Sequence, residues 1–244
     1  MPLAYRVIPT ILCRGRTQVK GERFDAWRSV GSVVQAVRVH AMRGVDEVVL
    51  LDIGATPEGR GPDLALVEEL SEVLFAPLAV GGGVKSVDDV RALLRAGADK
   101  VVIGEGSPIA TKLAAEVVGC QAIVVAIDVD ARGMVAWGGH KPSELSPVAY
   151  AQAVESEGAG EIILTSIDRE GTQRGYDLDL IRDVSKAVSI PVVAHGGCSG
   201  YEDMARAIEA GASAVAAGAL FQFTQATPRE AAKYLAEHGI EARV

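Results

Sequence analysis

The chain has 244 residues, of which 49 % are hydrophobic, and its formal net charge is −8 at pH 7. This acidic balance argues against a nucleic-acid-binding surface, which would be basic, and an aromatic content of 5 % argues against a base-stacking platform. About 250 residues is typical of one α/β barrel, so we expect a single domain over residues 1–244.

Eight short apolar runs alternate with segments of helical periodicity along the chain. The runs cover residues 6–12, 47–53, 77–83, 100–104, 122–128, 161–167, 190–197 and 214–218. They are continuously apolar, as expected for parallel strands that are buried on both faces. Segments 86–98 and 200–212, which lie between runs, carry apolar residues at helical spacing. Eight strand–helix units in this length predict a closed (β/α)8 TIM barrel.

The two halves of the chain repeat each other. EVVLLDIGATPEGRGPDLALVEEL from Glu47 matches EIILTSIDREGTQRGYDLDLIRDV from Glu161, and the offset of 114 residues also relates Gly82 to Gly196. We therefore expect two similar half-barrels, roughly residues 1–118 and 119–244. Such symmetry suits a substrate with two phosphate ends, although duplication alone would leave the same repeat.

Glycines gather at the ends of the predicted strands, where a TIM barrel holds its active site. Backbone N–H groups of glycines approach an anion closely, which favours phosphate binding, although tight turns also select glycine. In the first half, Glu105 would repel an anion beside Gly104. The candidate substrate- and phosphate-binding residues of these loops are Lys20, Asp52, Gly82, Gly83, Gly104, Gly171, Thr172, Gly196, Gly197 and Gly218.

Polar residues at the same strand ends are candidate acid/base groups. Asp128 ends an apolar strand, where desolvation would raise its pKa. Asp168 and Asp52 follow two other strands and could equally cap loops. His195 ends the seventh strand and is expected to titrate near pH 7. Lys20 is expected in a loop, where it could reach a substrate anion or simply be solvated.

Several kinds of site are not expected. The three cysteines and four histidines are scattered without disulfide or metal-ligand spacing, so we expect no metal and no cofactor. No stretch has the pattern of a signal peptide or of a membrane span, which predicts a cytoplasmic protein.

Charged residues stand at the starts of four predicted strands. Arg6, Glu47, Lys100 and Glu161 would meet at the N-terminal mouth of the barrel as two cations and two anions. They could form a salt-bridge ring that closes the barrel or a gate into its interior.

Six stretches then share a pattern with a known family. They are RVIPTILCRGRTQVKGERF, GGGVKS, GADKVVIG, VVAID, GAGEIILTSIDREGTQRGYDLDLI and IPVVAHGGCSG. Together they resemble the cyclase subunit of imidazole glycerol phosphate synthase over essentially the whole chain. The resemblance implies a (β/α)8 barrel, a small phosphorylated substrate and a glutaminase partner. Ammonia from that partner would pass through the barrel from its N-terminal face to the active site at its C-terminal face.

The resemblance also assigns roles to individual residues. It implies that Arg6, Glu47, Lys100 and Glu161 form the ammonia gate. It places Asp99 and Gln121 at or near the glutaminase contact and Lys20 on a mobile loop. It makes Asp128 one of two catalytic aspartates. It assigns phosphate binding to Gly82, Gly83, Gly171, Gly196 and Gly197.

The departures from the family concern the chemistry. Where the family reads RIIPCLDVRDG, this chain reads RVIPTILCRGR, so Leu12 stands in place of the second catalytic aspartate. Leucine transfers no proton, and loss of such a group typically costs ~10²–10⁴ in rate. An Asn-Ser/Thr pair is replaced by Gly104 and Glu105, and a serine by His195.

These departures favour a divergent paralogue. Such a barrel would pass ammonia to a separate amidotransferase that forms an amidine on a nucleotide-linked N-acetyl sugar. The first alternative is an authentic cyclase of histidine biosynthesis, in which Asp128, with His195 or Asp168, carries the proton transfers. The second alternative is a scaffold that activates a glutaminase without chemistry of its own.

Overall fold

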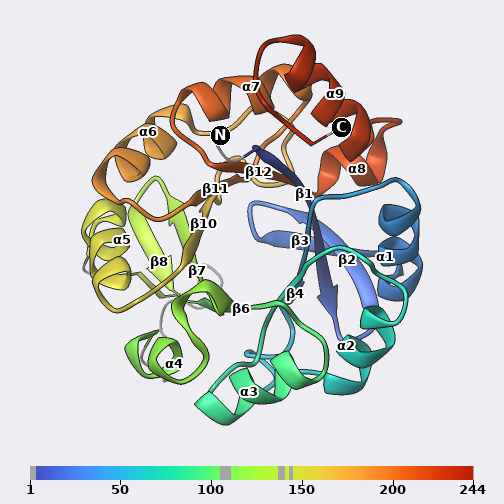
Figure 1. The fold of residues 1–244 in the computed structure, drawn as a ribbon, viewed down its shortest axis with the longest axis vertical. Coiled ribbons are helices and arrows are strands. Elements are labelled where there is room, and N and C mark those ends of the chain that lie inside the picture. The colour runs from blue at the N-terminus through green and yellow to red at the C-terminus, as the bar shows by residue number, and fades with distance from the viewer. Residues whose placement is uncertain (1–3, 105–110, 137–140, 143–144, 244) are drawn as a thin grey trace.

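The computed structural model describes residues 4–104, 111–136, 141–142 and 145–243. In this part of the chain, eight parallel strands close into a barrel within a ring of helices (Figure 1). The barrel strands are β1 (Arg6–Arg14), β4 (Val48–Asp52), β5 (Leu78–Gly81), β6 (Lys100–Gly104), β7 (Ile123–Asp130), β10 (Glu161–Ser166), β11 (Val192–His195) and β12 (Ala214–Ala217). Each strand pairs with the next in this order, and β12 pairs with β1. The predicted single-domain (β/α)8 TIM barrel is confirmed.

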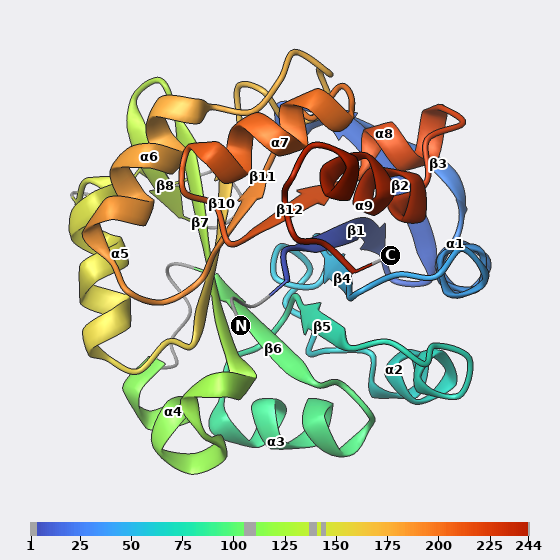
Figure 2. The same cartoon turned by 45° about the horizontal axis from the view of Figure 1, so that its top comes forward.

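Helices cover the outside of the barrel, as the turned view in Figure 2 also shows. They are α1 (Val33–Met42), α2 (Leu64–Ser71), α3 (Val87–Arg95), α4 (Thr111–Val118), the 3-10 turn η1 (Cys120–Ala122), α5 (Pro147–Ser156), α6 (Leu178–Ala187), α7 (Tyr201–Glu209), α8 (Ala219–Phe223) and α9 (Pro228–Glu237). None of the described helices is long and apolar enough to cross a membrane.

The internal repeat fixes where two of these helices begin. Asp63 Oδ1 accepts a hydrogen bond from Leu66 N at 3.0 Å at the start of α2. Its counterpart in the repeat, Asp177, accepts one from Leu180 N at 3.2 Å at the start of α6. Each carboxylate satisfies a backbone N–H that has no partner inside its helix. The division into half-barrels near residue 118 stays a prediction.

Two apolar layers hold the barrel. Side chains that point outward from the strands pack under the helices, whereas inward-pointing side chains fill the interior. The inner layer consists of Ile8, Val49, Ala79, Val102, Val124, Ile163, Val193, Ala214 and Ala216. This apolar layer therefore separates the two ends of the barrel.

Two antiparallel hairpins extend the barrel strands. β2 (Thr17–Glu22) and β3 (Asp25–Ser32) follow β1, while β8 (Gly133–Ala136) and β9 (Lys141–Pro142) follow β7. Lys20 was expected in a loop after the first strand, but residues 17–22 form the strand β2. Gln18, Val19 and Lys20 are all buried on β2, whereas most of β3 is exposed. A polar strand buried by neighbouring loops leaves no apolar run for sequence analysis to detect.

Candidate functional site

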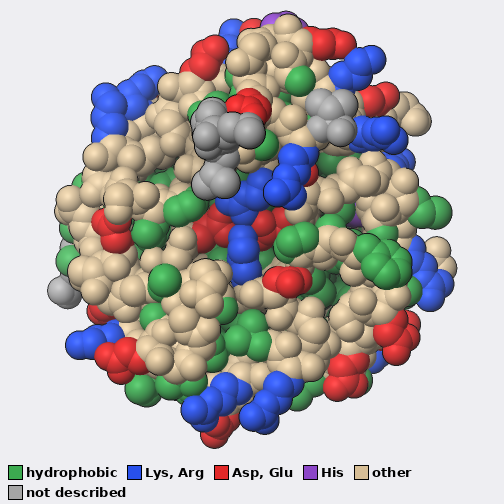
Figure 3. Space-filling model, viewed as in Figure 1, with side chains coloured by type: hydrophobic (Ala, Val, Ile, Leu, Met, Phe, Trp, Pro, Cys, Tyr) green, Lys and Arg blue, Asp and Glu red, His purple; other side chains and the backbone are tan. Residues whose placement is uncertain are grey.

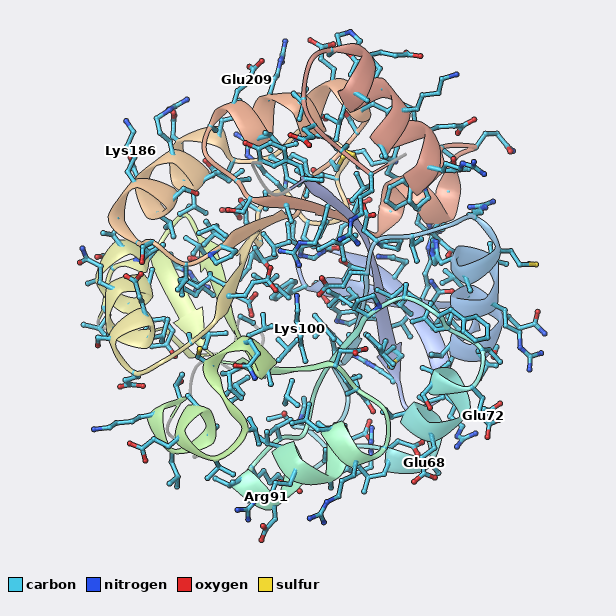
Figure 4. The ribbon with its side chains drawn as sticks, viewed as in Figure 1. Glu68, Glu72, Arg91, Lys100, Lys186 and Glu209 are labelled. Atoms are coloured by element: carbon cyan, nitrogen blue, oxygen red, sulfur yellow. The ribbon has the colours of Figure 1, made fainter. Side chains whose placement is uncertain are left out.

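Four charged side chains meet at the N-terminal ends of the barrel strands. Lys100 Nζ lies 2.9 Å from both carboxylate oxygens of Glu47 and 2.6 Å from Glu161 Oε2. Arg6 donates from one guanidinium nitrogen to Glu47 and from another to Glu161. Lys100 lies close to the barrel centre in Figure 4, and Figure 3 shows acidic side chains flanked by basic ones at the centre of this face. The four residues thus form a closed ring of alternating charge.

The ring is electrically neutral and largely buried. The side chains of Glu47 and Glu161 are 4 % and 7 % exposed, so each carboxylate depends on the two cations for its charge balance. Burial on its own would raise the pKa of Glu161, but the hydrogen bonds and charges of Arg6 and Lys100 outweigh burial and lower it. Opening the ring therefore means breaking ion pairs that little water can replace.

The two residues that the resemblance places at or near the partner contact lie on the same face of the barrel as this ring. Asp99 is exposed just before β6, where its Oδ2 accepts a hydrogen bond from Leu78 N at 2.8 Å. Gln121 is exposed in η1, just before β7. Both therefore stand at the N-terminal face, and their contact with a partner stays a prediction.

At the opposite end, the structure gathers the second-half glycines into one pocket. Gly171, Gly196, Gly197 and Gly218 all line it. The other lining residues are Glu170, Gln173, His195, Cys198, Ala216, Ala217 and Ala219. The pocket lies at the carboxyl ends of β11 and β12, which is where a TIM barrel binds its ligands.

Close backbone approach explains why glycine recurs in both halves. A β-carbon on Gly82 would lie 2.9 Å from the carbonyl carbon of Asp52, and one on Gly196 would lie 2.6 Å from Ser166 O. The residues approached, Asp52 and Ser166, are equivalent in the repeat. A β-carbon on Gly83 would lie 2.7 Å from Arg60 O. Packing thus requires these glycines whether or not they bind phosphate.

The predicted phosphate site of the first half-barrel has fewer closely packed glycines than that of the second. Gly104 is exposed, and a β-carbon there would meet no atom of the described residues within 4 Å. Glu105, whose charge was expected to oppose anion binding, lies outside the described residues. Close packing accounts for Gly82 and Gly83, whereas no contact with the described residues requires glycine at position 104.

Lys20 departs most from its expected surroundings. It lies on β2 rather than in a loop and is 1 % exposed. Its Nζ lies against Gly218, where a β-carbon would overlap it, and has no hydrogen-bond partner within the described residues. Burial lowers the pKa of Lys20, and the charge of nearby Glu170 opposes that shift. The expected loop position of Lys20 was wrong, because it lies on a strand of a hairpin that folds over the barrel, and burial excludes the solvated one of its two expected roles.

His195 does not titrate near neutral pH, contrary to expectation. Burial, with a smaller contribution from the Lys20 charge, lowers the pKa of His195 to about 3. The ring is 5 % exposed, and its Nδ1 lies 3.2 Å from Thr165 Oγ1. His195 is therefore a neutral side chain near pH 7, fixed by a hydrogen bond and suited to orienting a ligand rather than to taking up a proton.

The three candidate aspartates have different environments. Asp128 is half-buried on β7 in register with Thr165, which is itself in register with His195. Asp52 is paired with Arg60 at 3.1 Å and accepts a hydrogen bond from Gly54 N at 3.0 Å.

Asp168 is exposed and accepts a hydrogen bond from Ala131 N at 2.8 Å in the β7–β8 hairpin. Asp52 and Asp168 thus have the contacts of loop-capping carboxylates. Thr172 likewise donates its hydroxyl to Arg169 O at 2.8 Å within its own loop.

Leu12 is an apolar side chain at the C-terminal end of the barrel, where Asp128 provides a carboxylate. It is 3 % exposed on β1, paired in register with Leu51, and shares the inward face of Ile8 by strand alternation. Asp128 therefore offers a carboxylate on one side of the C-terminal mouth, and the opposite side offers an apolar side chain.

Sequence reasoning missed two polar residues at this end. Thr10 is 4 % exposed and Glu170 is 2 % exposed; Thr10 Oγ1 and Glu170 Oε2 make no hydrogen bond within the described part of the chain. A glutamate in a polar loop gives no sequence signal of burial. Among the described residues, no three His, Cys, Asp or Glu side chains gather as they would around a metal ion.

Comparisons with known proteins agree with this architecture. Residues 6–227 match the family of histidine biosynthesis proteins. The chain is 43 % identical to the imidazole glycerol phosphate synthase subunit HisF of Dictyoglomus thermophilum and 44 % identical to that of Hyphomonas neptunium. Each alignment covers 99 % of both chains. These relatives support the histidine-biosynthesis alternative and give no support to the expected sugar-modifying paralogue. The chain belongs to the HisF family of imidazole glycerol phosphate synthase subunits.

Proposed function

We propose that this chain is a HisF-type cyclase subunit, which receives ammonia at its N-terminal face and uses it on a phosphorylated ribonucleotide at its C-terminal face. The observation that carries the proposal is that the two ends of one barrel hold two different polar sites. A neutral charge ring closes the N-terminal mouth, and a glycine pocket with buried polar groups lies at the other end. Similarity to HisF subunits over 99 % of the chain supports the same assignment.

The barrel interior favours passage of ammonia over ions. Nine apolar side chains form a layer inside the barrel between its two ends. An ion entering this interior would lose its hydration without compensation, whereas neutral ammonia loses far less. Movement of Lys100 away from Glu47 and Glu161 would open the ring at its lysine side.

The N-terminal face also has a feature suited to a protein partner. Phe75, three residues before β5, is 97 % exposed, although a phenylalanine normally buries a large apolar area. It shares this face with Asp99, Gln121 and the ring. An aromatic side chain among polar residues is typical of a docking surface, here for a glutaminase subunit.

At the C-terminal face, Asp128 is the group that we assign to proton transfer. The glycine pocket would hold one phosphate, with Lys20 as its counter-charge. His195 would orient the substrate as a neutral hydrogen-bonding group. Leu12 removes the second carboxylate, so we expect slow cyclisation, with Asp128 acting alone.

The experiment combines the barrel with a glutaminase subunit. We expect glutamine to support cyclisation of the ribonucleotide as well as added ammonium does, and the barrel to stimulate glutamine hydrolysis. If ammonium supports cyclisation but glutamine does not, the conduit assignment fails. Stimulated glutamine hydrolysis without cyclisation would favour the second candidate function, a scaffold that activates a glutaminase. Leu12, which stands where a catalytic carboxylate is expected, is the one observation that favours this scaffold.

A further inference from the structure

Glu170 is the acidic residue among the lining residues of the glycine pocket. It lies in the loop after β10 and is 2 % exposed. Its Oε2 makes no hydrogen bond within the described residues, although a buried carboxylate normally has several partners. A carboxylate in this position opposes the binding of phosphate, so its presence in a phosphate pocket requires an explanation.

Lys20 provides the opposite charge at the same pocket. Its Nζ is buried against Gly218, another lining residue, and has no partner in the described part of the chain. Each of the two side chains shifts the pKa of the other in the direction expected of neighbouring opposite charges. Lys20 Nζ and Glu170 Oε2 have no hydrogen-bond partner among the described residues, so both atoms can meet an incoming ligand.

Two segments from opposite halves of the chain hold the pair together. Arg23 N, at the tip of the β2–β3 hairpin, donates a hydrogen bond to Glu170 O at 3.0 Å. A β-carbon on Gly171 would lie 3.0 Å from the α-carbon of Glu22, so glycine allows the loop and hairpin to touch. The pair thus forms when the hairpin rests on the loop.

We propose that Lys20 and Glu170 act as an anion switch in the glycine pocket. In the free protein Glu170 is the counter-ion of Lys20. When a phosphate group binds, Lys20 becomes its counter-ion and Glu170 takes up one proton from solvent; the proton returns to solvent when the anion leaves. Glu170 is therefore a positioning residue that makes anion binding depend on pH. The inference rests on the proposed function in taking the anion to be the phosphate end of the substrate.

The physical reason is the energy of like charges away from water. A phosphate beside an ionised carboxylate is strongly repelled at the low dielectric of a buried site. Burial raises the pKa of Glu170, Lys20 lowers it, and Glu22 raises it again. Once Lys20 turns to the anion, the stabilisation of the carboxylate is lost and the protonated form is favoured.

Other titratable groups around Lys20 and Glu170 would not make anion binding depend on pH in this range. Burial lowers the pKa of His195 on β11 to about 3 and that of His40 on α1 to about 4. Both stay neutral between about pH 5.5 and about pH 8. Glu22, next to the pair on β2, is exposed.

The test is calorimetric titration with sulfate, a phosphate analogue that keeps its charge over this pH range. For the native chain we expect weaker sulfate binding at about pH 8 than at about pH 5.5, with proton uptake on binding. Glu170→Gln removes the competing charge without changing the shape. It should bind sulfate roughly tenfold more tightly than the native chain at the higher pH, because the repelling charge is gone, and it should take up no proton.

Two further variants make the result specific. Glu22→Gln removes one negative charge from an exposed neighbour and should still take up a proton on sulfate binding, because Glu170 keeps its carboxylate. Lys20→Met should lose sulfate binding, which places the sulfate in this pocket. Native pH dependence in Glu170→Gln, or sulfate binding by Lys20→Met equal to the native, would overturn the switch. The titration involves no turnover, so its outcome is independent of the cyclase assignment.

Discussion

The amino group of Lys20 occupies the space that a β-carbon on residue 218 would need. A glycine at the end of the last barrel strand thus makes room for a buried lysine that reaches it from a hairpin of the first half. The glycine pocket and the lysine are therefore one structural unit.

Gly218→Ala tests that unit. The added methyl group must displace Lys20, and such overpacking typically costs ~1–3 kcal/mol of stability. We expect a lower free energy of unfolding in urea and weaker sulfate binding. Gly61→Ala is the matched control, because no atom of the described residues lies within 4 Å of a β-carbon there, and it should be neutral in both measurements. Equal effects of the two substitutions would refute the contact.

Lys100→Met tests the charge ring. Removing the lysine leaves Glu47 and Glu161 with Arg6 alone, and breaking a buried ion pair in this way typically costs ~3–5 kcal/mol. In the complex with the glutaminase we expect glutamine-driven cyclisation to fall while glutamine hydrolysis and ammonium-driven cyclisation persist. Steady-state assays with the two nitrogen sources check this, and an unchanged ratio between them would remove the gate assignment.

Phe75→Ser tests the docking face. The side chain is 97 % exposed, so its removal should leave the stability of the barrel within about 0.5 kcal/mol of the native value. Affinity for the glutaminase should fall by ~2 kcal/mol or more if Phe75 is an interface anchor. Leu113→Ser, at a half-exposed apolar residue on α4, is the control and should bind normally. Calorimetric binding constants decide between an anchor and an incidental exposed residue.

His195→Gln tests the burial of a neutral histidine. The pKa of His195 is about 3, below its unfolded value near 6.5, so the unfolded chain binds more protons and stability falls as pH drops between these values. This residue should account for a loss of about 2 kcal/mol between pH 7 and pH 5. We expect the free energy of unfolding of His195→Gln to fall less between pH 7 and pH 5 than that of the native chain. His238→Gln, at an exposed histidine, should behave as the native protein.

The fold was predictable because each barrel strand is a continuous apolar run and the helices have regular apolar spacing. The charge ring followed from the position of Lys100 and its three partners at strand starts, since parallel strands bring their first residues to one end. The hairpin that holds Lys20 was not predictable, because its burial comes from contacts with Gly218 and the Glu170 loop. The low pKa of His195 was missed for a related reason: its shift arises from burial, which a strand-end position does not reveal.

The central claim is that this barrel performs the cyclase reaction with Asp128 in spite of Leu12. The most direct test is turnover of the phosphorylated ribonucleotide by the chain alone with saturating ammonium. We predict slow turnover by the native chain, its loss in Asp128→Asn, and a rise of ~10²–10⁴ in Leu12→Asp. No turnover by either the native chain or Leu12→Asp would contradict the claim.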